Sequence, residues 1–362
     1  MERYLPHYIG AFALTLYLIH IFRSPAERVG LVDLPGGRKK HEGSIPLIGG
    51  IAIFAAFSFT ALFIPEPLRP FSTLFMGMGI LLIAGVLDDL HQITSPAKLV
   101  VQGLSAVLMV AWGDVTITHL GNLLGNGDIA LGAWSFPFTA LCVIGFINAF
   151  NMVDGIDGLA GAVLIVIAAW LAIAAGWVGL DFPVAMLALL IATVSAFLVL
   201  NFRHPWCKKA YVFMGDAGSL MLGFAVAWFA VRFSQGGPGG TIPPIVIAWI
   251  LALPVFDTVS VMVRRILKRQ SPFLADRKHL HHICVRAGYS HSTTVNLLIG
   301  VTAACGGIGV AGWHLGVTEP VLFLMFVAAF LVYLFFVLHA WKTMKILKRL
   351  RTYRRIRGRA LR

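Results

Sequence analysis

The sequence predicts an all-α membrane protein with about eleven transmembrane helices. Hydrophobic residues make up 58% of its 362 residues and charged residues only 12%, and the mean hydropathy is +0.84. A soluble protein with one buried core does not have this composition. The apolar residues also form stretches close to the length of about 17–25 residues that a membrane-spanning helix needs. No repeat or low-complexity segment divides them, so we expect one catalytic membrane domain at 1–341 and a basic tail at 342–362.

The expected spans follow the apolar stretches in order. They lie at residues 7–22, 45–64, 72–87, 97–112, 133–150, 158–176, 182–201, 212–232, 242–262, 294–315 and 319–341, and the one at 72–87 is among the shortest. The first lacks a small-residue cleavage site, so we interpret it as a permanent helix and not as a signal peptide. Pro254, Gly155 and Gly158 are expected to break or kink helices. Membrane proteins tolerate irregular backbone where it lines a cavity.

The basic residues predict the orientation. When the loops are assigned to alternate sides, 26 of the 29 Lys and Arg residues lie on one side, and only Arg3, Arg69 and Arg232 lie opposite. Because cytoplasmic loops carry the excess of Lys and Arg, we expect the N-terminus outside and the C-terminus in the cytoplasm. The tail at 342–362 holds ten basic residues and no acid. We interpret it as an anchor for anionic membrane lipid, and expect no nucleic-acid partner because no aromatic stacking pattern accompanies the charges.

Acidic residues gather at the expected cytoplasmic ends of the helices, where a membrane scaffold does not need them. Asp88 and Asp89 follow the third span, and Lys98 begins the next one. Adjacent carboxylates point in different directions on a helix, so one would face a cation while the other holds a basic partner. The helix dipole disfavours acids at a C-terminal end. A functional role therefore explains this pair better than helix termination does.

The densest polar cluster is the run Asn148-Ala-Phe-Asn151-Met-Val-Asp154-Gly-Ile-Asp157-Gly. Asn151, Asp154 and Asp157 recur at three-residue spacing and would share one face of a helix, although the glycines favour a turn. A charge at the bilayer centre costs roughly 2.5–3.5 kcal/mol even on lenient scales, so such a cluster indicates a wet site. Oxygen ligands of this kind suit Mg²⁺, which proteins bind through one or two carboxylates together with substrate phosphates.

Two further segments lie on the same expected side. The eighth span begins with Phe213-Met-Gly-Asp216, an acid flanked by small residues. A plain helix cap is the structural alternative, because the helix dipole favours an acid at an N-terminal end. The loop at 33–50 is basic and rich in glycine, which would let phosphate groups approach the backbone. Taken alone, it is equally explained as an ordinary cytoplasmic loop.

The loop at 263–293 carries the remaining cluster. Its chemistry-bearing residues are an acid, two arginines and three histidines: Asp276, Arg264, Arg265, His279, His281 and His282. Three histidines within four residues would bind phosphate oxygens or transfer protons. Zinc ligation is the weaker alternative, because neither a fourth ligand nor helical i, i+4 spacing accompanies them.

Together these motifs resemble the polyprenyl-phosphate N-acetylhexosamine-1-phosphate transferase family. The resemblance covers nearly the whole chain: Asp-Asp after the third span, Asn-x-x-Asn-x-x-Asp-Gly-x-Asp-Gly, Phe-Met-Gly-Asp and His-x-His-His occur in order. Residues 38–50, with Arg-Lys-x-His and Pro-Leu-Ile-Gly-Gly, look like the WecA-like branch of undecaprenyl-phosphate GlcNAc-1-phosphate transferases. They depart from the Pro-Thr-Met-Gly-Gly form of the muramoyl-pentapeptide branch.

The resemblance implies a Mg²⁺-dependent phosphoglycosyltransferase, with Mn²⁺ as an alternative ion. It would transfer N-acetylglucosamine 1-phosphate from UDP-GlcNAc to undecaprenyl phosphate at the bacterial cytoplasmic (inner) membrane and release UMP. The product, undecaprenyl-diphosphate-GlcNAc, would begin an O-antigen lipopolysaccharide or related polysaccharide pathway. Another UDP-N-acetylhexosamine remains an alternative donor. A homodimer remains open, since every span offers the small and apolar residues from which membrane interfaces are made.

The resemblance also assigns roles to residues. The implied metal ligands are Asn151 and Asp216. Residues expected near the substrates are Lys98 at the lipid phosphate, Gly155, Asp157 and Phe213 at the uridine, and Arg264, Arg265, His281 and His282 at the sugar phosphate. The candidate catalytic residues are Asp88, Asp89, Asp154 and His279.

Phosphoryl transfer depends chiefly on positioning and on neutralisation of spread negative charge. A phosphomonoester has a second pKa near 6, so most of the lipid phosphate is dianionic at neutral pH and needs no strong base. We therefore expect direct attack, with Asp88 as positioner or weak base, and keep a covalent phospho-aspartate as the alternative.

The rival classes are a zinc hydrolase and an ion-coupled transporter. A transporter would need acids near the bilayer midplane, and only Asp257, within two turns of Arg264, lies inside an expected span.

Overall fold

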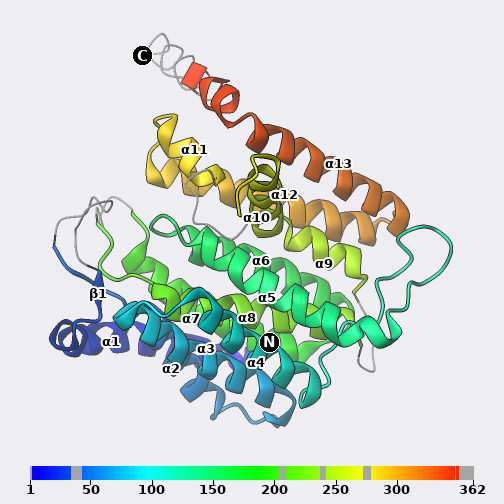
Figure 1. Ribbon diagram of the computed structural model, residues 1–362. Coiled ribbons are helices and arrows are strands. Elements are labelled where there is room, and N and C mark those ends of the chain that lie inside the picture. The colour runs from blue at the N-terminus through cyan, green and yellow to red at the C-terminus, as the bar shows by residue number, and fades with distance from the viewer. Residues whose placement is uncertain are drawn as a thin grey trace, which may run out of the picture.

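The computed structural model describes residues 2–33, 43–203, 209–236, 242–271, 279–346 and 348–349, and in them the chain is almost entirely helical (Figure 1). The helices are α1 (Leu5–Val29), α2 (Gly49–Ala61), α3 (Ser72–His91), α4 (Ser95–Ala111), α5 (Ser135–Val153), α6 (Leu159–Trp177), α7 (Asp181–Asn201), α8 (Gly215–Ser234), α9 (Pro244–Ile250), α10 (Ala252–Leu267), α11 (Leu280–Arg286), α12 (His291–His314) and α13 (Glu319–Leu338). Short 3₁₀ turns at Glu2–Tyr4, Arg69–Phe71 and Gly132–Trp134 precede α1, α3 and α5. Strands β1 (Val32–Asp33) and β2 (Ile45–Pro46) pair antiparallel.

Every expected span coincides with a helical segment, and the all-α, multi-pass class is confirmed. Among the described residues, eight helices are long and apolar enough to cross a membrane, namely α1, α3, α5, α6, α7, α8, α12 and α13, and the bent pair α9 and α10 is a ninth candidate. Helices α2 and α4 are apolar but have only 13 and 17 residues, so the count of eleven stays a prediction. The span expected at 72–87 is longer than predicted. Helix α3 continues to His91 because its terminal acids find partners, and α2 is shorter.

The expected helix interruptions are found. Helix α5 ends at Val153 and α6 begins at Leu159, so residues 154–158 form the turn that their glycines favour. The ninth expected span is broken as well, because α9 and α10 meet at Leu251 with a bend of 78°. Pro254 lies in the first turn of α10, where the N–H group that proline lacks would have no helical partner. After the break, α10 packs against α5 and α13.

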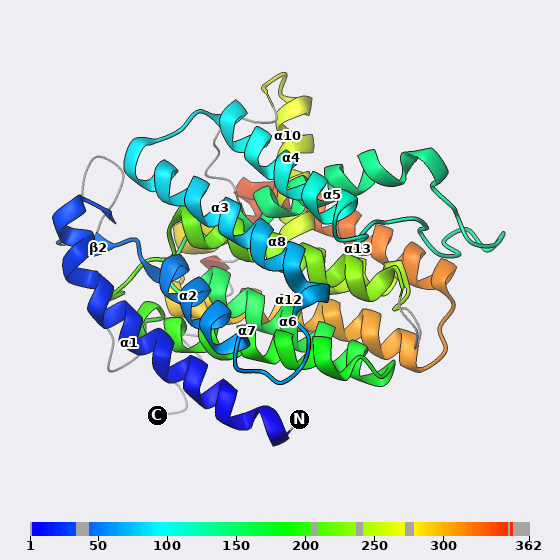
Figure 2. The same ribbon diagram turned by 90° about the horizontal axis from the view of Figure 1, so that it is seen from below.

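Helix α8 is the centre of the bundle. Almost all of its residues are buried, and α2, α3, α5 and α6 pack around it, as the view from below shows (Figure 2). Small residues allow the close approach: a Cβ atom on Gly85 of α3 would lie 2.2 Å from the Cα atom of Ala217. Membrane helices commonly use small residues to pack in this way. Helix α13, by contrast, has only two buried residues, Leu322 and Val337, and lies at the periphery (Figure 1).

The N-terminal end of α8 is tied to the segment that leads from β2 into α2. The Phe213 N–H donates to the Pro46 carbonyl at 2.9 Å, and the Gly49 N–H donates to the Phe213 carbonyl at 2.9 Å. The Pro-Leu-Ile-Gly-Gly and Phe-Met-Gly-Asp motifs, far apart in the sequence, are therefore neighbours. Phe213 acts here through its backbone.

The C-terminal end of α8 holds the loop at 113–132, drawn in teal at the right of Figure 1. The Gln235 side-chain oxygen accepts hydrogen bonds from the Thr118 and His119 N–H groups at 2.8 and 3.1 Å. With 20 residues at about 1.5 Å each, α8 is about 30 Å long. This loop is therefore separated by the length of α8 from the Phe-Met-Gly-Asp motif.

Candidate active site

Three charged side chains from three helices meet near the N-terminal end of α8. Lys98, in the first turn of α4, donates to Asp88 near the end of α3 and to Asp216 in the first turn of α8, the latter at 2.9 Å. The Asp88 and Asp216 carboxylates lie close together, because both contact the same Lys98 ammonium group. Asp88 thus holds the basic partner that the sequence predicts for one acid of the pair. Two acids and one cation leave excess negative charge.

Asp89 faces the end of α8. Its carboxylate oxygens accept hydrogen bonds from the backbone N–H groups of Asp216 at 3.0 Å and Ala217 at 3.3 Å. N–H groups in the first turn of a helix have no partner within that helix, so Asp89 caps α8 from a neighbouring helix. The capping role that the sequence left open for Asp216 belongs to Asp89. A catalytic role of Asp89 stays a prediction. What its hydrogen bonds do is hold the backbone of Asp216 at the start of α8.

Asn151, at the end of α5, joins the same cluster. Its amide nitrogen donates to Asp216 Oδ1 at 3.1 Å and to the Ser219 hydroxyl at 2.7 Å. Carboxylate, amide and hydroxyl oxygens around an excess of negative charge fit a hard divalent cation such as Mg²⁺. The amide nitrogen now faces Asp216, so the amide would have to turn over to offer its oxygen to an ion there. The two predicted metal ligands are in direct contact.

The turn between α5 and α6 carries the next two acids. Asp154 has many protein atoms around its carboxyl group, but part of its surface is exposed to water. Partial removal from water and the negative charges of Asp216, Asp157 and Asp89 raise the pKa of this carboxyl group above its usual range. Contact with water makes the rise smaller than complete burial would. Asp157 forms an ion pair with Arg203, whose Nε lies 2.5 Å from Asp157 Oδ2. Sequence reasoning missed Arg203, because a basic residue after a span was interpreted only as a sign of orientation.

The same turn meets the histidine motif. A Cβ atom on Gly155 would lie 2.3 Å from Nε2 of His281, so glycine is what lets the ring lie against the turn. His281 is 3% exposed, and its Nε2 has no hydrogen-bond partner among the described residues. Burial, followed by the charge of His282, lowers the pKa of His281 to about 3, so the ring is neutral at physiological pH. It could bind a phosphate by hydrogen bonding but not by charge.

His279 pairs with an acid that sequence reasoning set aside. Its Nδ1 lies 2.7 Å from Asp257 Oδ2, and both side chains are buried. Asp257 was considered as a neighbour of Arg264 on the same helix. Both residues do lie on α10, but Asp257 contacts His279, and Arg264 Nε and Nη1 have no partner within the described part of the chain. The available signal was an ionisable residue inside a span, which usually indicates function.

The other predicted residues belong to the same two segments as this pair, α10 and residues 279–282. Arg264 and Arg265 are buried in the last turn of α10. The His281 and His282 rings lie 4.1 Å apart between centroids, and those of His279 and His281 are nearly parallel at 5.8 Å. Over the residues described, no group of three or more His, Cys, Asp or Glu side chains is arranged to hold a metal. The described residues therefore give the zinc alternative no support. The candidate Mg²⁺ ligands around Asp216 are of another kind, two carboxylates and one amide.

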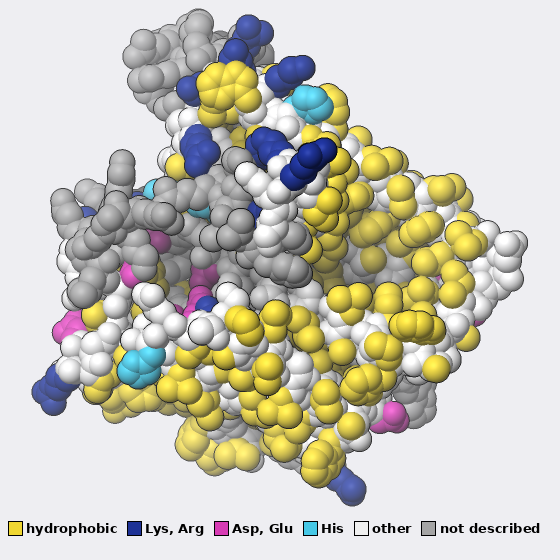
Figure 3. Space-filling view, viewed as in Figure 1, with side chains coloured by type: hydrophobic (Ala, Val, Ile, Leu, Met, Phe, Trp, Pro, Cys, Tyr) yellow, Lys and Arg dark blue, Asp and Glu magenta, His cyan; other side chains and the backbone are white. Residues whose placement is uncertain are grey.

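These contacts bring the predicted residues to one end of the bundle. The link runs from Asp88 through Asp216 and Asn151 to the turn at 154–158, and from there to His281. Figure 3 shows acidic side chains gathered in a recess at the left of the molecule, while the face to the right is broadly hydrophobic. Asp276, the basic residues at 38–41 and most of the basic tail lie outside the described residues.

Comparison with known proteins places this chain in a family. The sequence profile of glycosyl transferase family 4 matches residues 71–234. A protein of Escherichia coli O157:H7, named undecaprenyl-phosphate alpha-N-acetylglucosaminyl 1-phosphate transferase, is 36% identical over 353 residues, which cover 97% of this chain and 95% of that protein. The chain belongs to glycosyl transferase family 4. Relatives of the same name in Haemophilus influenzae and Yersinia pestis are 37% and 35% identical, covering 95% and 94% of this chain and 96% and 93% of their own lengths.

The family 4 match begins at the turn before α3 and ends with α8. It therefore includes Asp88, Lys98, Asn151 and Asp216. The His279 motif and Asp257 follow it in the chain. The relatives in family 4 nevertheless align over nearly the whole chain, so the likeness is not confined to the acid cluster.

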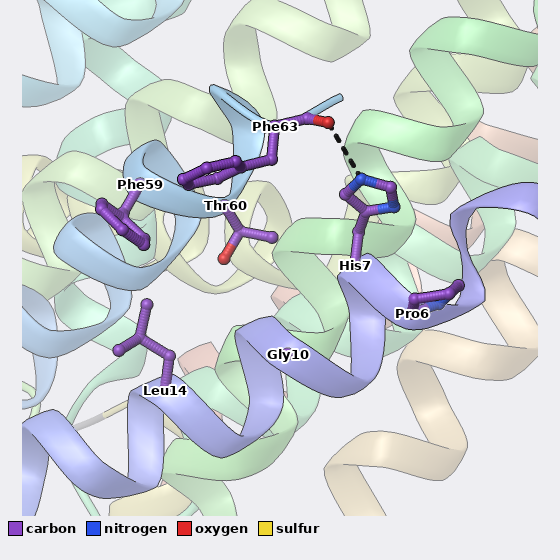
Figure 4. Close-up of a pocket in the computed structure, with 7 residues that line it drawn as sticks. All are labelled: Pro6, His7, Gly10, Leu14, Phe59, Thr60 and Phe63. Carbon is purple, nitrogen blue, oxygen red and sulfur yellow. Dashed lines mark hydrogen bonds between the residues drawn. The ribbon is translucent and has the colours of Figure 1, made fainter. Parts of the chain in front are cut away.

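A separate pocket in this family 4 chain lies at the other end of α2. It has a volume of about 370 Å³ and is lined by Pro6, His7, Gly10, Leu14, Phe59, Thr60 and Phe63. Figure 4 shows His7 pointing to the Phe63 carbonyl, at a distance of 3.1 Å. No carboxylate, lysine or arginine lines the pocket. Since the start of α2 adjoins Phe213, this apolar pocket is remote from the acid cluster.

Proposed function

We propose that the protein transfers N-acetylglucosamine 1-phosphate from UDP-GlcNAc to undecaprenyl phosphate, forming undecaprenyl-diphosphate-GlcNAc and UMP. The supporting observation is the meeting of Asp88, Lys98, Asn151 and Asp216 from four helices, in a chain that aligns along its length with relatives named for this transfer. Those names give the acceptor and the transferred group. UDP-GlcNAc as the donor is our inference, and another UDP-N-acetylhexosamine is the alternative.

For the metal we propose Mg²⁺, or Mn²⁺ in its place, held by Asn151 and Asp216. The support is chemical: oxygen donors surround a site where acids outnumber the one lysine. When bound, the ion would offset the negative charge of a diphosphate, which is the main demand of phosphoryl transfer. Asp89 keeps Asp216 in place through the N–H bond at the start of α8.

Lys98 and Asp88 are proposed to receive the lipid phosphate. The Lys98 ammonium binds both carboxylates and would also bind a phosphate oxygen, since charge-assisted hydrogen bonds to phosphate are strong. A phosphomonoester dianion can attack without a strong base. Asp88 as a nucleophile would first have to give up its bond to Lys98. This favours direct attack over a covalent phospho-aspartate.

The nucleotide sugar is proposed to lie between the turn at 154–158 and the histidine motif. Gly155, Asp157 and Phe213 would face the uridine, while Arg264, Arg265, His279, His281 and His282 would face the sugar phosphate. Support comes from the contact of Gly155 with His281, which joins the two segments. Buried Arg264 nitrogen atoms without a described partner are suited to an anionic ligand.

We propose the bacterial cytoplasmic (inner) membrane as the setting, with the site end and the C-terminus in the cytoplasm, and a cell-surface polysaccharide such as O-antigen as the product's destination. The excess of Lys and Arg on that side supports the orientation.

The eleven crossings would include α2 and α4. With 13 residues, α2 is about 20 Å long, shorter than a hydrocarbon core of about 30 Å, so it would cross only where the bilayer thins or flanking residues contribute.

The test uses the purified full-length protein with UDP-GlcNAc and undecaprenyl phosphate. We expect UMP and the lipid-linked sugar only when both substrates and Mg²⁺ are present. No product with any UDP-sugar of a panel would contradict the proposal. UMP exchange without lipid would instead favour the phospho-aspartate. Substrate-dependent proton uptake by sealed vesicles would favour the transporter class.

A further inference from the structure

A buried carboxylate outside the acid cluster holds the histidine motif in place. Asp257 of α10 is 5% exposed, and its Oδ2 lies 2.7 Å from Nδ1 of His279. Its Oδ1 accepts hydrogen bonds from the Leu280 N–H at 3.0 Å and from the Tyr333 hydroxyl of α13 at 2.8 Å. A buried charge is costly unless it is paired and hydrogen-bonded. These three partners explain how the acid persists inside an apolar helix.

The contacts decide which nitrogen of His279 carries the proton. The Leu280 N–H must donate to Asp257 Oδ1, so that oxygen is an acceptor. An ionised carboxylate has no proton to give, so the Nδ1 of His279 donates to Oδ2. This bond selects one tautomer and one ring orientation. The Nε2 atom then faces away from Asp257 and is unprotonated, so it can accept a hydrogen bond or a proton from a substrate hydroxyl group.

We propose that Asp257 is a positioning residue for His279, and that Tyr333 in turn positions Asp257. The inference rests on the proposed transfer, because it assigns the unprotonated Nε2 atom of His279 to accept a hydrogen bond from a hydroxyl group of the sugar phosphate. It also gives the peripheral helix α13 a link to the site. The other titratable side chains around the pair are His281, His282, Cys284 and Cys305.

Asp257 could alternatively serve only to anchor the start of α11 through Leu280. The Asp257→Asn variant separates the two roles. The amide oxygen can still accept from the Leu280 N–H and the Tyr333 hydroxyl, so the anchor is kept. The amide nitrogen would then donate to Nδ1 of His279, which moves the ring proton to Nε2. A pure anchor would tolerate this change, whereas a positioning residue would not.

The kinetic test measures kcat and KM for UDP-GlcNAc in the full-length enzyme. We expect Asp257→Asn to lower kcat by about 100-fold or more, as wrong-tautomer variants of such pairs do, with KM changed less than about threefold. In a His279→Gln background the same substitution should cause no further loss, because its effect acts through His279. Independent, additive losses would overturn the inference. Asp128→Asn, an acid-to-amide control in the loop at 113–132, should leave kcat unchanged.

A readout that needs no turnover is the nitrogen NMR spectrum of histidine-labelled protein. The wild type should carry the His279 proton on Nδ1, and Asp257→Asn should carry it on Nε2. If Asp257→Asn does not fold, Tyr333→Phe serves instead, and we expect it to lower kcat several-fold only while His279 is present. An unchanged tautomer, or full activity in both variants, would overturn the inference. If the wild-type protein transferred no sugar phosphate at all, the proposed function would be contradicted. The NMR measurement of the His279 tautomer would still test the role of Asp257.

Discussion

The backbone N–H of Asp216 donates to Oδ1 of Asp89 at 3.0 Å, across the contact between α3 and α8. The preceding residue, Asp88, binds Lys98, and Lys98 also binds the Asp216 carboxylate at 2.9 Å. Successive helical residues point about 100° apart, so the two adjacent acids reach different partners. One of them positions the backbone of Asp216, while the other reaches its side chain through a lysine.

Asp89→Ala should reduce both stability and activity. It leaves the Asp216 and Ala217 N–H groups without their acceptor, and losing a helix cap costs about 0.5–2 kcal/mol. Asp89→Asn should lose less, because one amide oxygen can still accept. Thermal unfolding in detergent and the rate of UMP release check the order wild type, Asn, Ala. Equal melting temperatures for all three would show that the cap does not stabilise α8.

Lys98→Gln should weaken the use of the lipid substrate. The change removes the cation that binds Asp88 and Asp216, and a charge-assisted hydrogen bond of about 1.5–3 kcal/mol corresponds to a rise of roughly 10- to 100-fold in KM for undecaprenyl phosphate. Kinetics at varied lipid concentration measure it. Lys345→Gln, on an exposed residue beside Trp341, is the matched control and should behave as wild type. If both variants raised the KM for undecaprenyl phosphate equally, the cause would be a general loss of surface charge and not the loss of Lys98 from the site.

Asp216→Asn should abolish the metal-dependent release of UMP, and extra Mg²⁺ should not restore it. Asn151→Ala should lose activity too, but excess Mg²⁺ should restore part of it, because the carboxylate remains. A second check does not depend on activity. Adding Mg²⁺ together with UDP-GlcNAc should raise the melting temperature of the wild type but not that of Asp216→Asn. If Asp216→Asn kept the full metal-dependent rise, the ion would have to bind elsewhere.

Gly155→Ala should impair the site through His281. Its added methyl group would fall 2.3 Å from the buried ring, and such overpacking typically costs about 1–3 kcal/mol. Gly176→Ala is the matched control, since a Cβ atom there meets nothing within 4 Å. The Gly155→Ala, His281→Ala double variant should recover much of the lost melting temperature. Without that recovery, the clash with His281 would not be the cause.

His281 should make the protein less stable as the pH falls. Its pKa is about 3 in the folded protein, mainly because of burial, and about 6.5 when unfolded, so below pH 6.5 the unfolded chain binds the extra proton. Stability is therefore complete above pH 6.5 and declines by about 1.4 kcal/mol per pH unit below it, down to about pH 3. Melting temperatures at pH 7.5 and 5 should differ more for the wild type than for His281→Gln. An identical pH dependence would refute this assignment.

The placement of the candidate residues could be predicted from the sequence because water-free lipid excludes charge. Asp88, Asn151 and Asp216 each stand at the end of an apolar stretch, so they had to lie where helices end. The positive-inside pattern placed those ends on one side, and the structure brings them together. The same reasoning noted only Arg264 near Asp257, inside an apolar stretch, and did not predict its contact with His279.

Only the tertiary structure decided the partners. Asp89 caps α8, Asp257 holds His279 across 22 residues of sequence, and Asp157 pairs with Arg203. Apolar stretches determine where each helix begins and ends, because their length must match the membrane. They do not determine the rotation of a helix about its axis, and one residue changes the direction of a side chain by about 100°. The partner of each charge is therefore decided by how the helices pack around α8.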